Sequence, residues 1–174
     1  MIKGLCVLAL FVSSLAFADS ESPICGKLIP CGNYYGDVVN IDPTSGETAG
    51  GYSERVIVQK LGIYQAAILL MVAYGDGGHD YTWMTLDFEN DDGKLNADGK
   101  FVIYDGGPNL IGTNKIGQGQ CQYLNCKYSY ESKFKKIKNG SLSFQDQKVQ
   151  LVESELGSVN GDLIHSGSLN RDIR

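Results

Sequence analysis

Histidine is the side chain best suited to proton transfer near neutral pH, and this chain of 174 residues has two of them. His79 lies in the glycine-rich stretch Gly75–Asp80 beside two aspartates, a grouping that could hold a metal ion. Because a single histidine in a turn more often has no chemical role, we expect no metal site there. No helix is predicted to follow the stretch, so its glycines do not indicate a phosphate site either. His165 alternates in phase with Leu163 and Leu169, which predicts a hydrogen-bonded core histidine rather than a catalytic base.

Carboxylates are the second candidate for chemistry, because two acids in different environments can serve as acid and base. Glu153 and Glu155 fall on one face of a predicted strand, where we expect solvated charge at a strand end. The acidic stretch Asp87–Gly99 resembles a calcium loop, but it fails the first ligand position of an EF-hand. We therefore expect two turns there, Asn90–Gly93 and Asn96–Gly99. No Gly-x-Ser-x-Gly or His-Glu-x-x-His motif is present, so the sequence predicts no enzyme, no cofactor and no metal.

Aromatic residues are the third candidate, because the chain has ten tyrosines and one tryptophan, several of them on predicted strands. Each combines an apolar ring with a polar tip that needs a partner or water. Packing in the core is one interpretation, since aromatic residues are favoured in strands. The wall of a ligand-binding cavity is the other. Four of these residues are the candidates for such a wall: Tyr34, Trp83, Tyr128 and Tyr130.

The N-terminal segment Met1–Ala18 has the pattern of a secretory signal peptide. Lys3 precedes an apolar run of 13 residues, Leu5–Phe17, and Ala16–Ala18 forms an A-x-A cleavage site. We expect the remainder, residues 19–174, to form a single domain. No later apolar run reaches the roughly 18 residues of a membrane helix. A short leader with a single lysine is typical of bacteria, so we expect export to a periplasmic or extracellular location.

Four cysteines follow the leader, at positions that suit local pairing: Cys25, Cys31, Cys121 and Cys126. An even number of cysteines in an exported chain predicts two disulfides, with three possible connectivities. We favour Cys25–Cys31 and Cys121–Cys126, each of which closes a small loop. The crossed pairing would instead tie the N-terminal segment to a later hairpin. A zinc site is disfavoured by the cysteine spacing and by an oxidising compartment.

The charge balance excludes some partners. Removing Lys3 with the leader leaves 14 basic residues against 20 acidic ones, a net charge of −6. An acidic chain is a poor binder of nucleic acid or of anionic membranes. The one basic cluster, Lys133–Lys138, falls at a strand end, where we expect a solvated loop.

Short strands are the elements that would position these residues. Turns rich in Gly, Asn and Asp separate segments of strand length at roughly ten-residue spacing. The predicted strands are Asn33–Ile41, Tyr52–Leu61, Gln65–Tyr74, Tyr81–Phe88, Lys100–Asp105, Leu110–Gln120, Cys126–Phe134, Ser141–Phe144, Lys148–Leu156 and Asp162–Arg171. The second strand places Val56 and Val58 on one face with Glu54. Such a pattern is typical of an antiparallel barrel or sandwich, and we predict an all-β fold, a single up-and-down barrel of about 8–10 strands without substantial helix.

The segment Gln65–Tyr74 is the ambiguous element, because several of its residues are good helix formers. A strand is favoured because Gly62 and Gly75 bracket only about three helical turns, and no N-cap residue precedes the segment. A strand that is apolar on both faces is buried on both faces. In a barrel, its outer face must then lie under a covering segment or form an exposed patch.

The layout resembles the lipocalin-like branch of the calycin barrels. That family has Gly-x-Trp on the first strand, and here Gly32–Tyr34 stands in that place with Tyr for Trp. The family also has an arginine after the last barrel strand that packs over the tryptophan, and Arg171 would be its counterpart. The resemblance implies an exported carrier of a small apolar or amphipathic ligand. The alternative is a filled barrel that acts through its surface loops, Asp42–Gly51 and Gly75–Asp80, as an envelope-associated interaction or inhibitor protein. The sequence identifies no protein partner.

Overall fold

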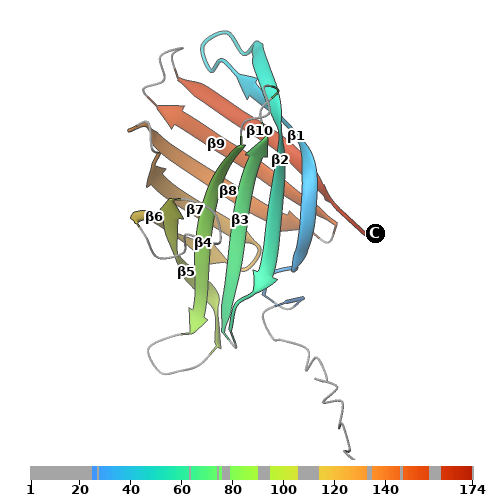
Figure 1. Cartoon of the computed structure of the whole chain (residues 1–174), viewed down its shortest axis with the longest axis vertical. Coiled ribbons are helices and arrows are strands. Elements are labelled where there is room, and N and C mark those ends of the chain that lie inside the picture. Colours follow the sequence, from blue (N-terminus) through green and yellow to red (C-terminus); the bar gives the residue numbers. More distant parts are fainter. Residues whose placement is uncertain are drawn as a thin grey trace, which may run out of the picture.

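The chain folds into a closed antiparallel β-barrel of ten strands (Figure 1). The computed structural model describes residues 25–26, 28–62, 64–73, 75, 79–89, 95–105, 114–132, 135–145, 147–156 and 162–173. Each strand pairs with the next one in sequence, and β10 pairs with β1 to close the barrel. The signal peptide predicted at Met1–Ala18 lies outside the described residues. The predicted up-and-down barrel is confirmed.

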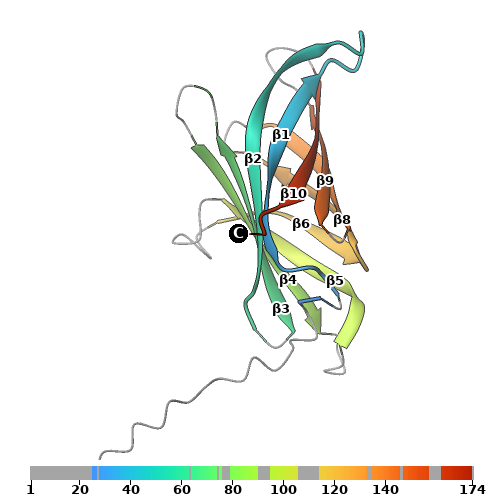
Figure 2. The same ribbon diagram turned by 90° about the vertical axis from the view of Figure 1, so that its right-hand side faces the viewer.

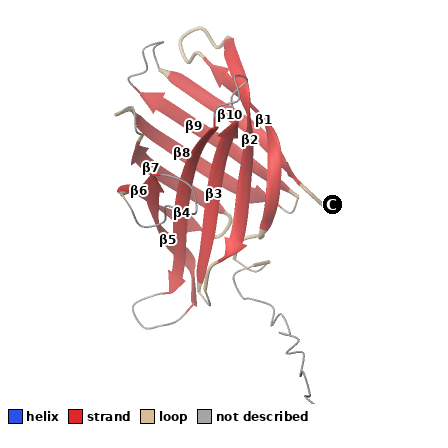
Figure 3. Ribbon diagram, in the orientation of Figure 1, coloured by secondary structure: helices blue, strands red, loops and turns tan. Residues whose placement is uncertain are grey.

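The ten strands carry the labels of Figure 1. They are β1 (Gly32–Ile41), β2 (Thr48–Lys60), β3 (Gln65–Ala73), β4 (His79–Glu89), β5 (Leu95–Asp105), β6 (Lys115–Gln122), β7 (Asn125–Glu131), β8 (Ile137–Gln145), β9 (Lys148–Leu156) and β10 (Leu163–Arg171). The described residues include no helix (Figure 3), and none of their segments is a helix able to cross a membrane. The prediction of strand rather than helix for β3 is therefore confirmed.

One predicted turn is wrong. Residues Asn96–Gly99 belong to β5, which begins at Leu95 and pairs with β4 and β6. Gly99 lies within the strand at a place where neighbouring side chains already fill the barrel interior. An added Cβ there would come closer than 3.0 Å to the side chains of Leu86 and Phe88. Its role is therefore close packing within the barrel rather than a reversal of the chain.

The lower end of the barrel is the end that carries residues 61, 62 and 64 and the Cys25–Cys31 disulfide. The upper end carries the β1–β2 loop at residues 42–47. The β1–β2 hairpin forms the tip of the upper end (Figure 2). Side chains alternate between the two faces of each strand, and the lower interior receives apolar ones. Residues of that lower core include Ile29, Tyr34, Val58, Ala66, Phe88, Phe144, Val149 and Leu169. This half of the barrel is filled by protein.

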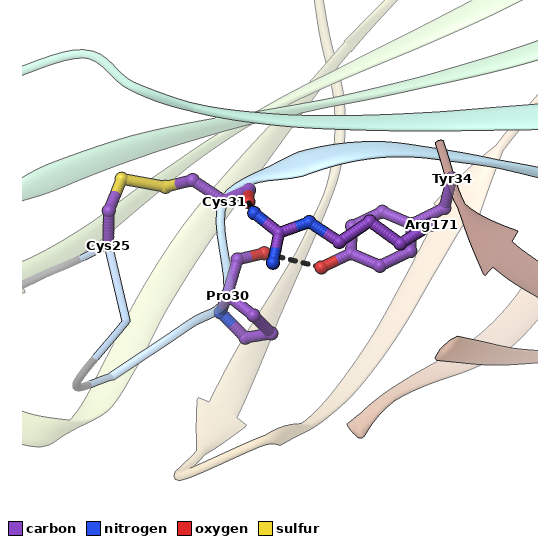
Figure 4. Close-up of a disulfide and its surroundings, with 5 residues drawn as sticks. All are labelled: Cys25, Pro30, Cys31, Tyr34 and Arg171. Carbon is purple, nitrogen blue, oxygen red and sulfur yellow. Dashed lines mark hydrogen bonds between the residues drawn. A yellow bond between two sulfur atoms is a disulfide. The ribbon is translucent and has the colours of Figure 1, made fainter. Parts of the chain in front are cut away.

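The lower end is closed by the segment before β1. Ile29 is buried in the barrel core, and the Tyr34 hydroxyl donates to the carbonyl oxygen of Pro30 at 2.9 Å. Arg171, the register partner of Tyr34, runs along the tyrosine ring and donates from Nη2 to the carbonyl oxygen of Cys31 at 2.7 Å (Figure 4). Arg171 thus packs against the residue that stands at the position expected for the lipocalin-like tryptophan.

Two local disulfides form, Cys25–Cys31 and Cys121–Cys126, as predicted. The second joins the register partners of the β6–β7 hairpin, whose Cα atoms lie 3.9 Å apart. Both of its cysteines are buried. The crossed pairing, which would have fastened the lead to this hairpin, does not occur.

Removal of the hairpin disulfide is expected to cost about 2 kcal/mol of unfolding free energy, because a loop with a sequence separation of 5 restricts the unfolded chain only a little. The change is Cys121→Ala with Cys126→Ala, since alanine leaves no buried hydroxyl without a partner. Urea unfolding followed by circular dichroism measures the loss. Failure of the double variant to form a barrel at all would contradict this estimate.

Candidate functional site

The upper half of the barrel interior is polar, in contrast to the lower half. Charged and hydroxyl side chains from five strands, and from the residue that precedes β8, meet there. We call this set the upper polar cluster, and its members are Glu54, Tyr128, Tyr130, Lys136, Lys138, Glu153, Glu155 and His165. Its three carboxyl groups and its histidine are all buried.

Strand alternation places each member of the cluster. In β2, Glu54 follows the inward face of Val56 and Val58, as predicted. In β9, Glu153 and Glu155 continue the inward face of Val149 and Leu151. These glutamates therefore enter the interior because the strand keeps its period of two as its residue types change from apolar to acidic.

Tyr128 and Glu153 form the centre of the cluster. The tyrosine hydroxyl donates to Oε1 of Glu153 at 2.6 Å, a short bond of the kind that a charged acceptor makes. Nζ of Lys138 lies 3.5 Å from Oε2 of the same carboxylate. Glu153 is 3% exposed, so the hydroxyl donor and the ammonium charge replace the water that it would otherwise bind.

The rim of the cluster joins Glu155 to three other groups. Lys136 donates a hydrogen bond to Glu155, and Nζ of Lys138 lies 3.7 Å from the same carboxylate. On the other side, Nε2 of His165 is 3.6 Å away from it. Nδ1 of His165 lies 2.7 Å from Oδ1 of Asn40 and donates to it. Nε2 is then the acceptor nitrogen of the neutral ring.

Two buried polar atoms of the cluster have no hydrogen-bond partner among the described residues. They are Oε2 of Glu54 and Nε2 of His165. Tyr52 is a neighbour of both residues, since it hydrogen-bonds Glu54 and its ring centroid is 5.7 Å from that of His165. A buried polar group without a hydrogen-bond partner costs about 1–3 kcal/mol of folding free energy. Two such atoms in one region mark the upper interior as a place where a bound molecule could supply the missing partners.

The electrostatic environment of Glu54 favours the neutral form of its carboxyl group. Burial, and then the negative charge of Glu153, raise the pKa of Glu54 well above its ordinary value, and Lys138 offsets only part of that effect. Burial also raises the pKa of Glu155, but the hydrogen bond from Lys136 and the charge of Lys138 leave it below its ordinary value. Glu153 and Glu155 thus face two lysines, whereas the surroundings of Glu54 favour its protonated form.

The surroundings of the two tyrosines and the histidine of the cluster also favour their neutral forms. Burial, followed by the charge of Glu153, raises the pKa of Tyr128 and of Tyr130 well above the ordinary value of tyrosine. Burial and then the charge of Lys138 lower the pKa of His165. The predicted inward, hydrogen-bonded histidine is confirmed, since His165 is buried and bound to Asn40.

Glu54→Gln is expected to stabilise the barrel, and the gain should grow with pH. A raised carboxyl pKa means that the stability contributed by Glu54 is complete below its ordinary pKa of 4.5 and is lost as pH rises through the folded value. Between pH 4.5 and the raised pKa of the folded state, the unfolding free energy of the glutamine variant should rise relative to that of wild type. The expected rise is on the order of 1.4 kcal/mol per pH unit. Urea unfolding at several pH values measures the gain, with Glu131→Gln on the outer face of β7 as control. Equal stability of wild type and Glu54→Gln at every pH would contradict the assignment.

The structure separates the four residues expected to line a ligand cavity. Tyr128 and Tyr130 belong to the upper polar cluster, with ring centroids 6.1 Å apart. Tyr34 lies in the lower core. Trp83 lies on the opposite face of the sheet, in a second cluster with Ala67 and Leu69.

Trp83 therefore cannot share a wall with the three tyrosines, which corrects the expectation of a common site. It is 2% exposed, and its Nε1 has no partner within the described part of the chain. The apolar outer face predicted for β3 is thus a buried cluster on the outside of the barrel. A ligand-binding role for the tyrosines stays a prediction.

Sequence reasoning missed the acidic and basic members of the cluster. Glu153 and Glu155 are buried, not solvated at a strand end. Within the basic cluster 133–138, Lys136 and Lys138 turn inward to these glutamates. The alternation of side chains along the strand could have revealed this. Both glutamates follow Val149 and Leu151 at intervals of two residues and therefore point to the same, inner face.

A groove of about 750 Å³ lies on the outside of the barrel over β4–β7. It is lined by side chains that point outward from four adjacent strands. Four of them are register partners in a row across these strands: Asp87, Lys100, Gln120 and Lys127. Among the described residues, no three or more His, Cys, Asp and Glu side chains are placed to hold a metal ion.

No protein-family model matches this chain, and neither does any curated protein. Similar solved structures include EF1p2_mFAP2b bound to DFHBI, with 13% identity and a TM-score of 0.41, covering 82% of this chain and 93% of that one. Another is a redesigned beta barrel, b11L5F_LGL, with 12% identity and a TM-score of 0.41, covering 82% of this chain and 90% of its own. Structural similarity at this low level carries no information about the function of this chain.

Proposed function

We propose that this chain is an exported ligand-binding barrel that holds a small amphipathic molecule in the upper half of its interior. The observation that carries the proposal is the pair of buried polar atoms without a described partner, Oε2 of Glu54 and Nε2 of His165. Buried polar atoms in folded proteins nearly always have partners, and a bound molecule with hydrogen-bonding groups would supply them. The proposal assigns binding, and no catalysis, to the cluster.

The two sides of the upper interior favour an amphipathic ligand. Strands β3–β5 contribute Leu70, Met84 and Ile103 to the core. Strands β2 and β7–β10 contribute the charged and hydroxyl groups, such as Glu54, Tyr130 and Glu153. Apolar walls with a few convergent polar groups are typical of small-molecule sites. The expectation of a small apolar or amphipathic ligand is therefore narrowed to an amphipathic one, with a polar head.

Two further features support export and a lipocalin-like relationship. Two disulfides are typical of proteins folded in an oxidising compartment. Tyr34 on β1 and Arg171 on β10 pack together where the lipocalin-like pair is expected. The barrel departs from that family in having ten strands, whereas lipocalins have eight.

Native mass spectrometry of the protein purified from its own host, without denaturation, tests the proposed function. A retained small molecule that is released on unfolding is the expected result, and its mass gives the ligand class. The bare polypeptide in every preparation would contradict the proposal.

A barrel that acts through its surface is the second candidate, and the outer groove over β4–β7 favours it. The groove carries charges of both signs, with Lys100 directly opposite Asp87 in the register. A protein or glycan partner could bind there without entering the barrel. Paired substitutions Lys100→Ala and Lys127→Ala would weaken such a partner and leave a ligand of the interior unaffected.

A further inference from the structure

We infer that the upper polar cluster recognises a ligand with an ammonium head, whose N–H donors reach Oε2 of Glu54 and Nε2 of His165. The inference rests on the proposed function and adds the chemical class of the ligand. It starts from the two atoms that no described residue pairs with. Both are acceptors when Glu54 is ionised, and an ammonium group supplies three donors and no acceptor.

The position of Glu54 suits such a role. Its side chain is 2% exposed on the inner face of β2. The titratable groups that act on it come from its own strand and from three others: Tyr52, Tyr128, Tyr130, Lys138 and Glu153. The ring centroid of Tyr52 also lies 5.7 Å from that of His165, so one tyrosine neighbours both residues that carry the acceptor atoms.

The charges of the cluster lack one cation. Lys138 lies within 3.7 Å of both Glu153 and Glu155, and Lys136 is paired with Glu155. These ammonium groups are therefore already engaged with two carboxylates. Glu54 is the third carboxyl, and no described cation is placed within ion-pair distance of it. In the empty barrel a proton fills that place, and in the complex the ligand head fills it.

Other head groups fit less well. An anionic head would add a negative charge next to Glu153, where repulsion already acts on Glu54. A neutral hydroxyl head could bond to one acceptor but would bring no charge to stabilise the ionised carboxylate. Hydrogen bonds between charged partners in a buried site are roughly twice as strong as neutral ones. The missing charge therefore favours a cation.

Binding then exchanges one proton for one ligand. Glu54 as a carboxylic acid releases its proton to solvent, the ammonium head keeps its own protons, and the carboxylate accepts a hydrogen bond from it. The net charge of the cluster is unchanged by the exchange. Affinity should rise about tenfold per pH unit until Glu54 is ionised in the empty barrel, and then level off.

Isothermal titration calorimetry with three probes of nearly equal shape tests the inference: 2-phenylethylammonium, 2-phenylethanol and phenylacetate. The protein is first unfolded and refolded to remove any resident molecule. Repeating the titration in buffers of different ionisation enthalpy counts the protons released. We expect the ammonium probe to bind at least tenfold more tightly than the other two, with release of close to one proton.

Glu54→Gln separates the outcomes. In this variant the ammonium probe should bind about 10- to 100-fold more weakly and release no proton, whereas Glu131→Gln should behave as wild type. Binding of the alcohol as tight as that of the amine, unchanged by Glu54→Gln, would overturn the ammonium inference and leave the proposed function standing. Binding of none of the three probes, together with a bare polypeptide in native mass spectrometry, would overturn both.

Discussion

Glu153→Ala is expected to lower the free energy of unfolding by about 3–5 kcal/mol, because it removes one partner from a buried charge network. The Tyr128 hydroxyl would lose its acceptor at 2.6 Å, and Lys138 would lose the nearer of its two carboxylates. Both groups lie inside the barrel, where water does not readily replace the missing partner. The loss should therefore exceed that of an ordinary surface substitution several-fold.

Urea unfolding measures this loss, with one m-value (the slope of unfolding free energy against urea concentration) used for all variants. Val152→Ala is the matched control, because Val152 is the adjacent residue of β9, points outward and is 44% exposed. Glu153→Gln should fall between the two, since an amide oxygen can still accept from Tyr128 but carries no charge for Lys138. A cost for Glu153→Ala no larger than that for Val152→Ala would show that the network contributes little to stability.

Gly140→Ala is expected to cost about 3 kcal/mol, because the ring of Tyr128 lies directly over this glycine. Gly140 is the register partner of Tyr128, and an added Cβ would come closer than 3.0 Å to its Cζ, Cε2 and hydroxyl atoms. The ring cannot move away freely, because its hydroxyl is bound to Glu153. A single methyl group would therefore disturb both the packing of the Tyr128 ring against β8 and the upper polar cluster.

Two variants control this experiment. Gly75→Ala adds the same methyl group where nothing lies within 4 Å, so its effect on unfolding should be small. In a Tyr128→Leu background, the clashing atoms are gone, and Gly140→Ala should then cost much less than it does in wild type. Equal costs in the two backgrounds would mean that the ring is not the obstacle.

Much of the fold was predictable because alternation and turn chemistry are local. The phase of Tyr128 and Tyr130 in β7 and the pairing of each cysteine with its near neighbour needed only short-range information. Tyr34 and Arg171 were matched through a family resemblance, and the structure pairs them as the first and last strands close the barrel.

The site was not predictable to the same degree, because it depends on the register in which neighbouring strands pair. Glu153 alone is a charged residue near a strand end, and surface charge is its usual meaning. Its burial requires Lys138 on the neighbouring strand and Tyr128 beyond that, a combination set by the register of β7, β8 and β9. For Trp83, the sequence could not decide which face of an apolar hairpin points inward.

The protonation of Glu54 tests the central claim most directly. The ¹³C shift of its carboxyl carbon, assigned through the signal lost in Glu54→Gln, can be followed in the empty barrel from about pH 4 to about pH 9. Burial and the charge of Glu153 raise the pKa of this carboxyl, so we expect it to titrate well above an ordinary glutamate. Titration at the ordinary value would place Glu54 in water and contradict a binding site built around it.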